Sequence, residues 1–323
     1  KLILLPRLHL KSTVFTVGWT LWKLTQDQDL RFLFVSHKSE DSQKFLAILK
    51  DYMLSSRFRY FFPEVIMETG KGRGQEWNKG RILIRRNATL KENTIECASE
   101  SAQVTGRHYD VIIFDDLVTA DSVKTPQLIQ DTLDYHAHCQ SLFDPGALEL
   151  VIGTRYDFSG LYRTIIDKPE LAEEYDITVM QCYDEEGLPI YPSRFTLADD
   201  DEVHPDDKTK SKLSLPKLRR VQGSWVFSCQ YMNNPIPSDL QTFKREWIRY
   251  IDPAELPAAE HCRWFRVGDI SSETDTKSSY TCLVTGCVDQ HCNTYVTDIW
   301  WGVFPEHEVI EELFRGQMVP EDR

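Results

Sequence analysis

Two short pairs of residues suggest the chemistry of this chain. Lys11 and Ser12 follow one short apolar run, and Asp115 and Asp116 follow another. A lysine and a hydroxyl at the start of a helix suit a nucleoside triphosphate, because the lysine reaches the β- and γ-phosphates and the hydroxyl binds Mg²⁺. An acid at a strand end holds that Mg²⁺ through water, and a second carboxylate orients or deprotonates the attacking water. The two pairs together predict a nucleoside-triphosphate hydrolase.

The loop before Lys11 fills the frame of a phosphate-binding loop, G-x-x-x-x-G-K-[ST], with LPRLHLKS at 5–12. Leucine stands at both glycine positions of that frame, Leu5 and Leu10. Because Leu8 and Leu10 leave the loop without glycine, a positive φ would be costly there. A chance Lys-Ser at the start of a helix is common, so the loop alone indicates nucleotide binding only weakly.

Residues farther along the chain strengthen this interpretation. The apolar run at 111–114 ends in Asp115, although an aspartate that merely caps a strand is the commoner explanation of one such residue. The next apolar run, at 148–153, leads into Thr154 and Arg155, where a polar side chain could sense the γ-phosphate. Three such segments in the right order are much less expected by chance than any one of them.

A sheet must position these residues. Helical spacing of apolar residues predicts helices over 11–24 and 39–55. Apolar and β-type runs predict strands at 1–5, 31–36, 81–85, 94–98, 111–114, 148–153 and 177–182. Strands that are apolar throughout and alternate with helices are typical of a parallel sheet covered on both faces. The predicted fold class is therefore α/β, with a mostly parallel sheet over residues 1–185.

The rest of the chain differs in character. Residues 186–260 hold eight of the fifteen prolines and most of the charge runs, so we predict a linking subdomain with little regular structure. Residues 261–323 form a third region, in which a helix opens at Pro305. Before that helix, three antiparallel strands are predicted at WFRVGD (264–269), YTCLVTGCV (280–288) and TYVTDIWW (294–301).

Composition limits the class of protein. No apolar stretch approaches the about 20 residues needed to span a membrane, so we expect no membrane association. The eight cysteines form no CxxC pair. Cys287, His291 and Cys292 could form half of a metal site, but ordinary reduced cysteines are the favoured interpretation. The opening residues KLILLP begin inside a predicted strand, which suggests a fragment that lacks N-terminal residues.

The net charge of −13 is unusual for a protein that acts on DNA. A local basic surface is the best candidate for DNA contact, and it directly follows the acidic run at 199–207. Its residues are Lys208, Lys210, Lys212, Lys217, Arg219 and Arg220. A solvated, mobile loop is the favoured alternative for both charge runs.

Four segments resemble the large terminase subunit of tailed phages, the motor that packages DNA into capsids. They match, in the same order, the Walker A loop, the Walker B strand, the coupling motif and the segment leading into the nuclease domain of that family. The segments are PRLHLKST (6–13), TGRHYDVIIFDDL (105–117), VIGTRY (151–156) and QYMNNPIPSDLQTFKREWIRYI (230–251). The resemblance implies a P-loop ATPase domain of the ASCE type, followed by the first part of an RNase H-like nuclease domain.

The resemblance also implies a role for each matching residue of the nucleotide site. Lys11 would bind the β- and γ-phosphates, Ser12 would ligate Mg²⁺, and Arg7 would contact the γ-phosphate. His9 and Thr13 complete the ATP-binding residues of this loop.

Residues of the later segments have catalytic roles in the same scheme. Asp115 would be the carboxylate on the Mg²⁺ side, and Asp116 stands where many members have glutamate. Thr154 would couple hydrolysis to domain motion. Arg107 would be an arginine finger acting on a neighbouring subunit, and a surface arginine or a structural ion pair is an equally weighted alternative.

The strands after residue 260 resemble the nuclease domain of the same family, which cuts DNA with two metal ions held by carboxylates. Asp269 fits the first ligand of Mg²⁺ or Mn²⁺ at that site. Asp275 and Asp298 are nearby carboxylates, for which a loop aspartate and a strand-end aspartate are the simpler explanations. The remaining ligands are expected beyond Arg323, so we expect no DNA cleavage by this chain alone.

As a whole, the resemblance implies an ATP-driven motor that translocates double-stranded DNA into a procapsid. Its implied partners are the portal protein, the small terminase subunit and further copies of itself in a ring, in the host cytoplasm and transiently docked on the procapsid. A helicase-like P-loop ATPase is one alternative, but it would need a second ATPase-like domain after residue 190. A degenerate nucleotide-binding scaffold is another, and the glycine-free loop favours it.

Overall fold

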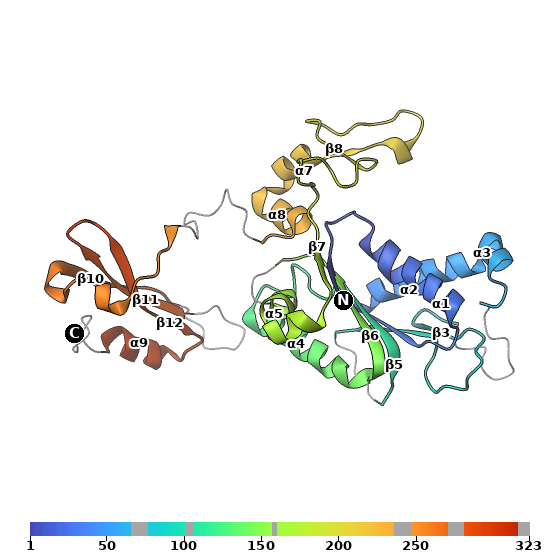
Figure 1. Ribbon diagram of the computed structural model, residues 1–323, viewed down its shortest axis with the longest axis horizontal. Coiled ribbons are helices and arrows are strands. Elements are labelled where there is room, and N and C mark those ends of the chain that lie inside the picture. The colour runs from blue at the N-terminus through green and yellow to red at the C-terminus, as the bar shows by residue number, and fades with distance from the viewer. Residues whose placement is uncertain (66–76, 101–105, 157–159, 236–246, 271–280, 316–323) are drawn as a thin grey trace. The chain divides into compact units, whose positions relative to one another are not determined.

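The computed structural model describes residues 1–65, 77–100, 106–156, 160–235, 247–270 and 281–315 (Figure 1). The chain divides into two compact units. The first comprises Lys1–Lys124 and Ile129–Gln241, and the second comprises Thr125–Leu128 and Thr242–Arg323. The first unit therefore includes most of the predicted linking subdomain, 186–260, because it extends to Gln241.

A seven-stranded sheet forms the centre of the first unit, in the order β3-β4-β2-β5-β6-β1-β7. Neighbouring strands are parallel except β3 and β4, which are antiparallel. The strands are β1 (Leu2–Leu4), β2 (Phe32–Ser36), β3 (Arg81–Ile82), β4 (Ile95–Ser99), β5 (Tyr109–Asp115), β6 (Phe143–Gly153) and β7 (Ile177–Val179). The predicted α/β class with a mostly parallel sheet is confirmed.

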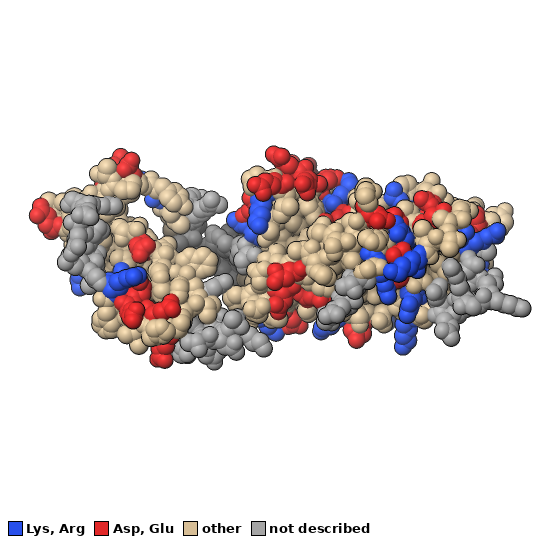
Figure 2. Space-filling model, turned by 90° about the horizontal axis from the view of Figure 1, so that it is seen from below, with Lys and Arg blue, Asp and Glu red and all other residues tan. Residues whose placement is uncertain are grey.

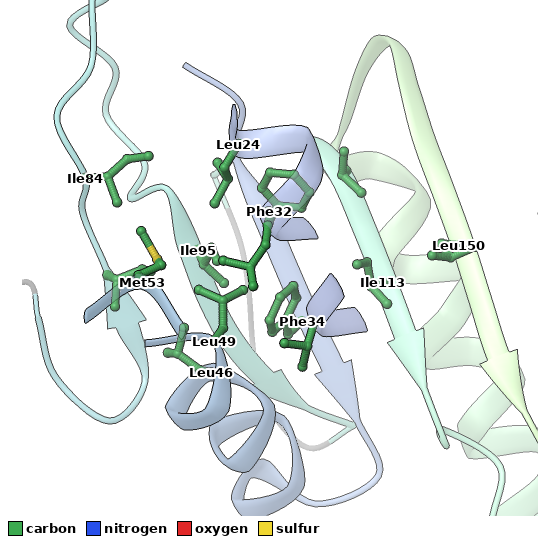
Figure 3. Close-up of a cluster of buried hydrophobic side chains, with 14 of the residues drawn as sticks. Leu24, Phe32, Phe34, Leu46, Leu49, Met53, Ile84, Ile95, Ile113 and Leu150 are labelled. Carbon is green, nitrogen blue, oxygen red and sulfur yellow. The ribbon is translucent and has the colours of Figure 1, made fainter. Parts of the chain in front are cut away.

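Helices cover one face of this sheet through an apolar cluster (Figure 3). Phe32 and Phe34 of β2 and Ile113 of β5 meet Leu46 and Leu49 of the helix above them. The elements on this face are the π-helix η1 (Ser12–Gly18), α1 (Trp19–Gln26) and α2 (Ser39–Leu54), and α3 (Ser56–Phe61) follows α2. The helices predicted over 11–24 and 39–55 are thus present, the first beginning as a π-helix.

A second apolar cluster covers the opposite face of the sheet, where the alternate residues Leu33, Ile112 and Phe114 point. The helical elements that contribute to this cluster are α4 (Pro126–Cys139), η2 (Gln140–Leu142) and α5 (Leu161–Asp167), and α6 (Pro169–Glu174) follows α5. Tyr162 of α5 is completely buried in this cluster. Because both faces are buried, the central strands carry apolar residues at consecutive positions, such as 32–35 and 111–114, rather than alternating.

The prediction of little regular structure after residue 186 is wrong for the residues that precede the second unit. They form β8 (Phe195–Thr196), η3 (Lys208–Lys210), β9 (Leu213–Ser214), α7 (Leu215–Gln222) and α8 (Ser224–Met232). These elements share a small core that includes Phe195, Phe227 and Tyr231. Pro216 does not interrupt α7, because it occupies the first turn, where no backbone N–H is needed for the helix.

The second unit contains a three-stranded antiparallel sheet and a helix. Two short turns, η5 (Pro253–Glu255) and η6 (Ala259–His261), precede β10 (Cys262–Asp269), β11 (Thr281–Asp289), β12 (Thr294–Gly302) and α9 (Glu306–Phe314). The side chain of Arg266 in β10 donates to the Glu312 carbonyl of α9 at 2.7 Å, which ties the helix to the sheet. The three predicted strands and the helix near Pro305 are confirmed.

Across the part of the chain that the structure describes, no helix combines the length and the apolar character that crossing a membrane requires.

Candidate nucleotide site

The two residue pairs meet at one edge of the first unit's sheet. Leu4 of β1 pairs with Gly153 of β6, and Asp115 of β5 pairs with Ile152 of β6. These strands are parallel, so their carboxyl ends lie at the same edge. The loop after β1 therefore stands beside Asp115 and Thr154, although Asp115 is 103 residues from Ser12 and Thr154 is 143 residues from Lys11 in the sequence.

The loop after β1 adopts the left-handed geometry without any glycine. Leu8 has φ 64° and Leu10 has φ 60°, and both side chains are 47% exposed. Asp116, at the end of β5, also has a positive φ, of 49°. A left-handed conformation costs an ordinary L-residue roughly 1–2 kcal/mol. The strain expected from the sequence is therefore present, and it is concentrated where the strands end.

Exchange of Leu10 for glycine tests this strain. We expect Leu10→Gly to raise the free energy of unfolding by about 1 kcal/mol, because glycine adopts positive φ readily. The matched control is Leu188→Gly, since Leu188 is 49% exposed and does not have a positive φ. That control should lose roughly 0.5–1 kcal/mol. Urea denaturation of both variants measures the difference, and equal losses in the two would contradict strain at Leu10.

Lys11 lies between the ends of β5 and β6. Its ammonium donates to Thr154 Oγ1 at 2.6 Å and forms an ion pair with Asp116 Oδ1 at 2.7 Å. The Lys11 side chain is only 11% exposed, whereas that of Asp116 is 44% exposed. The lysine thus touches both residues that the sequence assigns to hydrolysis and coupling.

Asp115 is almost completely buried and accepts hydrogen bonds from two hydroxyls of η1. Ser12 donates to its Oδ1 at 3.0 Å and Thr16 donates to its Oδ2 at 2.5 Å. Burial, and then the neighbouring Asp116 carboxylate, raise the pKa of Asp115 to about 7. Thr16 is not among the residues predicted from the sequence. Its signal was its position one helical turn after Ser12, on the same side of the helix.

The oxygens of Ser12 and Asp115 fit a magnesium ion. Mg²⁺ takes hard oxygen ligands and is usually held by one or two carboxylates together with substrate phosphates. A hydroxyl and a carboxylate 3.0 Å apart at the start of η1 supply such oxygens. Among the described residues, no group of three or more His, Cys, Asp or Glu side chains is placed to hold a metal ion.

Arg7, His9 and Thr13 have different surroundings. Arg7 and Thr13 line a cavity of about 570 Å³ together with Lys11 and Ser12. The Arg7 guanidinium lies near the Tyr156 hydroxyl, where it opposes the rise in the Tyr156 pKa that burial causes. The His9 ring does not line this cavity, because it stacks on another side chain, described below.

The segment after β6 is held by a residue that the sequence analysis did not identify. Asn233 accepts a hydrogen bond from the Arg155 backbone N–H at 3.0 Å and donates to the Met180 carbonyl at 2.8 Å. Its φ of 49° places it in the left-handed region, at the end of α8. Arg7 N also donates to the Gln230 carbonyl of α8, at 2.7 Å. α8 therefore contacts both the loop after β1 and the segment after Thr154.

Arg107 lies away from Lys11. It precedes the amino end of β5, whereas Asp115 is at the carboxyl end. Its guanidinium forms an ion pair with Glu96 of β4, which also accepts from the Tyr109 hydroxyl at 3.2 Å. The structure thus shows the structural ion pair that was the alternative to an arginine finger. Action on a neighbouring subunit stays a prediction.

Two of the three carboxylates considered for the nuclease site lie in strands of the second unit. Asp269 is the last residue of β10, and Asp298 lies in β12. Asp269 pairs in register with Cys282, and Asp298 with Thr285, so the two carboxylates occupy different rows of the sheet. Asp275 lies outside the described residues.

The cysteines and histidine near 290 do not form a cluster. Cys287 is buried in β11, while Cys292 is exposed in the turn before β12. His291 N donates to the Asp289 carboxylate, which organises that turn. Ordinary reduced cysteines therefore remain the interpretation that fits.

The basic run at 208–220 is neutralised by the acidic run before it. At least four of its six basic side chains form ion pairs within the segment. These pairs are Lys210–Asp207, Lys212–Glu202, Lys217–Asp201 and Arg220–Asp199. Figure 2 shows the underside of the view in Figure 1, in which α7 and β8 lie at the top, and on that underside too lysine and arginine side chains are scattered among acidic ones. A DNA backbone would have to displace these carboxylates, so the structure does not favour this run as a DNA contact.

Comparison of the sequence with protein-family models finds no match, and comparison with curated proteins finds no relative.

Proposed function

We propose that the chain is a nucleoside-triphosphate hydrolase that uses ATP. The observation that carries this proposal is the meeting of five side chains from three separate segments at one sheet edge. They are Lys11, Ser12, Asp115, Asp116 and Thr154. A cation, a hydroxyl beside a buried carboxylate and a second, more exposed carboxylate are the groups that phosphoryl transfer from ATP to water requires.

The contacts of Lys11 suggest how ATP would change the site. A polyphosphate that binds the ammonium competes with Asp116, which now holds it at 2.7 Å. Asp116 would then be free to accept a proton from the attacking water. The oxygen of that water would form a bond to the γ-phosphorus while the bond from the γ-phosphorus to ADP breaks and ADP leaves. Ser12 and Asp115 would hold the Mg²⁺ ion, which would supply positive charge to offset that of the polyphosphate.

The same displacement supports a coupling role for Thr154. Its hydroxyl now accepts from Lys11 at 2.6 Å, and the next residue, Arg155, is held through its N–H by Asn233 at the end of α8. If Lys11 released Thr154, the segment from Thr154 to Arg155 could move, and the hydrogen bond to Asn233 would pass this movement to α8. These contacts would connect a bound polyphosphate to a helix of the same unit.

The resemblance to large terminase subunits extends the proposal to a DNA-packaging motor. Under it, the chain would act as a homo-oligomeric ring on double-stranded DNA with the portal protein and the small subunit, in the host cytoplasm. Its second unit would belong to an RNase H-like nuclease that uses Asp269 with Mg²⁺ or Mn²⁺. The order of the four matching segments and the strand-strand-strand-helix order of the second unit support this extension.

Each alternative function has its own expected observation. A helicase-like ATPase needs a second ATPase-like domain after residue 190, but the described residues there form short elements and an antiparallel sheet. A nucleotide-binding scaffold is favoured by the strained Leu8 and Leu10. It would bind ATP without turnover.

Lys11→Ala tests the proposed function. We expect ATP hydrolysis by the purified chain to fall by on the order of 10²-fold or more, because the variant loses the cation that meets the developing phosphate charge. Lys44→Ala is the matched control, since Lys44 is an exposed lysine paired with Asp41 on α2. Phosphate release measures turnover. Hydrolysis that persists in Lys11→Ala would contradict the proposal, and binding without turnover in the wild-type chain would support the scaffold.

A further inference from the structure

The cavity beside Lys11 has a second wall, which comes from a later part of the first unit. The phosphate-loop side of the cavity includes Arg7, Lys11 and Ser12, with Asp116 at the end of β5. The opposite side is formed by Tyr191, Ser193, Arg194 and Thr209. None of these four residues belongs to a segment from which nucleotide binding was predicted.

Arg194 is a half-buried cation on the wall of this cavity. In the ranges that the structure describes, no carboxylate forms an ion pair with it, although the chain carries 50 acidic residues against 37 basic ones. Basic side chains nearby in the same subdomain, such as Lys217 and Arg220, are paired with aspartates. A half-buried arginine that faces a cavity, with no such partner among the described residues, indicates an anionic ligand.

The fold holds the Arg194 backbone beside the phosphate loop. Its N–H donates to the Tyr191 carbonyl at 3.0 Å, and its carbonyl accepts from Leu213 N at 2.9 Å. The next residue, Phe195, is buried and stacks on the His9 ring, with centroids 4.7 Å apart and planes 13° apart. His9 belongs to the loop itself, so this stack attaches the second wall directly to the loop.

We propose that Arg194 binds the polyphosphate chain of the nucleotide, as a cation supplied by the same polypeptide as Lys11. The guanidinium is planar and always charged, so its fork of N–H donors fits phosphate oxygens bidentately. Arg7, Lys11 and Arg194 then form a cationic set around the cavity. His9 has a positioning role in this arrangement, because its ring fixes Phe195 and with it Arg194. This inference rests on the proposed nucleotide binding.

Arg194→Ala tests this assignment by calorimetric titration of ATP and ADP into the nucleotide-free chain. We expect affinity for both nucleotides to fall about tenfold, the loss typical of one charge-assisted contact to phosphate. Arg194→Lys should recover part of that loss, because a lysine keeps the charge but not the fork. Arg220→Ala removes an equivalent charge from the same subdomain outside the cavity, so ATP affinity should not change.

Three results separate the possible explanations. ATP affinity unchanged in Arg194→Ala but lost in Lys11→Ala would overturn the role of Arg194 and leave the proposed function standing. No ATP binding by the wild-type chain would instead remove the proposed function. If Arg194→Ala lowers the melting temperature without nucleotide and Arg194→Lys recovers no affinity, the residue is structural and the proposal fails.

Discussion

Replacement of Asp115 by asparagine should stop ATP hydrolysis and at the same time stabilise the fold above neutral pH. Asparagine keeps one oxygen to accept from one of the Ser12 and Thr16 hydroxyls, and its amide N–H can donate to the other, but it loses the charge that would hold Mg²⁺. Burial and Asp116 disfavour that charge in the folded chain, and they raise the pKa of Asp115 to about 7. Removal of a buried charge that lacks a full counter-charge relieves this cost.

The pH dependence of this effect follows from the direction of the pKa shift. Since the folded chain holds the Asp115 proton up to higher pH than the unfolded chain, ionisation destabilises the fold as pH rises through that window. The stability gain of Asp115→Asn should be small near pH 4 and reach up to about 4 kcal/mol above pH 8. Urea denaturation across this pH range measures it.

Asp110→Asn is the matched control, because Asp110 lies in the same strand and its pKa is shifted in the opposite direction. Although burial acts to raise the pKa of Asp110, hydrogen bonds from the Arg31 side chain and backbone hold it below the usual range. The ionised Asp110 carboxylate stabilises the fold at pH values above the pKa that this residue has in the unfolded chain. This contribution is lost as pH falls through the lower pKa of Asp110 in the folded chain. Asp110→Asn should therefore lose stability at pH 8. Destabilisation of both variants at that pH would contradict the account of Asp115.

Gly153→Ala is expected to destabilise the fold strongly. A Cβ at this position would lie 1.9 Å from the Tyr162 hydroxyl oxygen and 2.4 Å from its Cζ. Tyr162 is completely buried in the cluster under β6, so it cannot move aside without repacking α5. Overpacking of this severity should cost about 3 kcal/mol or more. The segment that carries Thr154 would shift with it, so ATP hydrolysis should fall too.

Two further variants isolate the steric cause. Gly80→Ala should be nearly neutral, since the nearest atom to its added Cβ is the flexible Asn78 side chain at 3.9 Å. Tyr162→Phe in the Gly153→Ala background removes the closest atom and should restore part of the lost stability. Thermal unfolding of the wild-type chain, the two single glycine variants and the double variant measures both effects. A Gly153→Ala chain as stable as Gly80→Ala would contradict close packing between Gly153 and Tyr162.

Local patterns were enough to predict most of the fold. Apolar runs such as 111–114 are strand-sized and appear as buried strands, and the spacing in 39–55 appears as α2. These predictions hold because strand and helix periodicity is a property of neighbouring residues. The proline-rich segment after 186 was misjudged, because the sequence does not distinguish a proline in a loop from Pro216 in the first turn of α7.

Part of the candidate site was also within reach of the sequence. Parallel strands end at one edge, so polar residues after several of them were expected to meet, as Lys11, Asp115 and Thr154 do. That inference needs only chain order and strand direction. It needs no knowledge of which side chains from other segments complete the site.

Sequence patterns alone predict most of the elements and the residues at their ends. The remaining features arise only in the packed chain, because they depend on contacts between distant residues. The structure showed the left-handed Leu8 and Leu10, the raised pKa of Asp115 and the links of Thr16 and Asn233. It also neutralised the basic run with its acidic neighbour and placed Arg194 on the cavity wall. Burial, desolvation and charge pairing sum over every neighbour in space, and only the packed chain determines those neighbours.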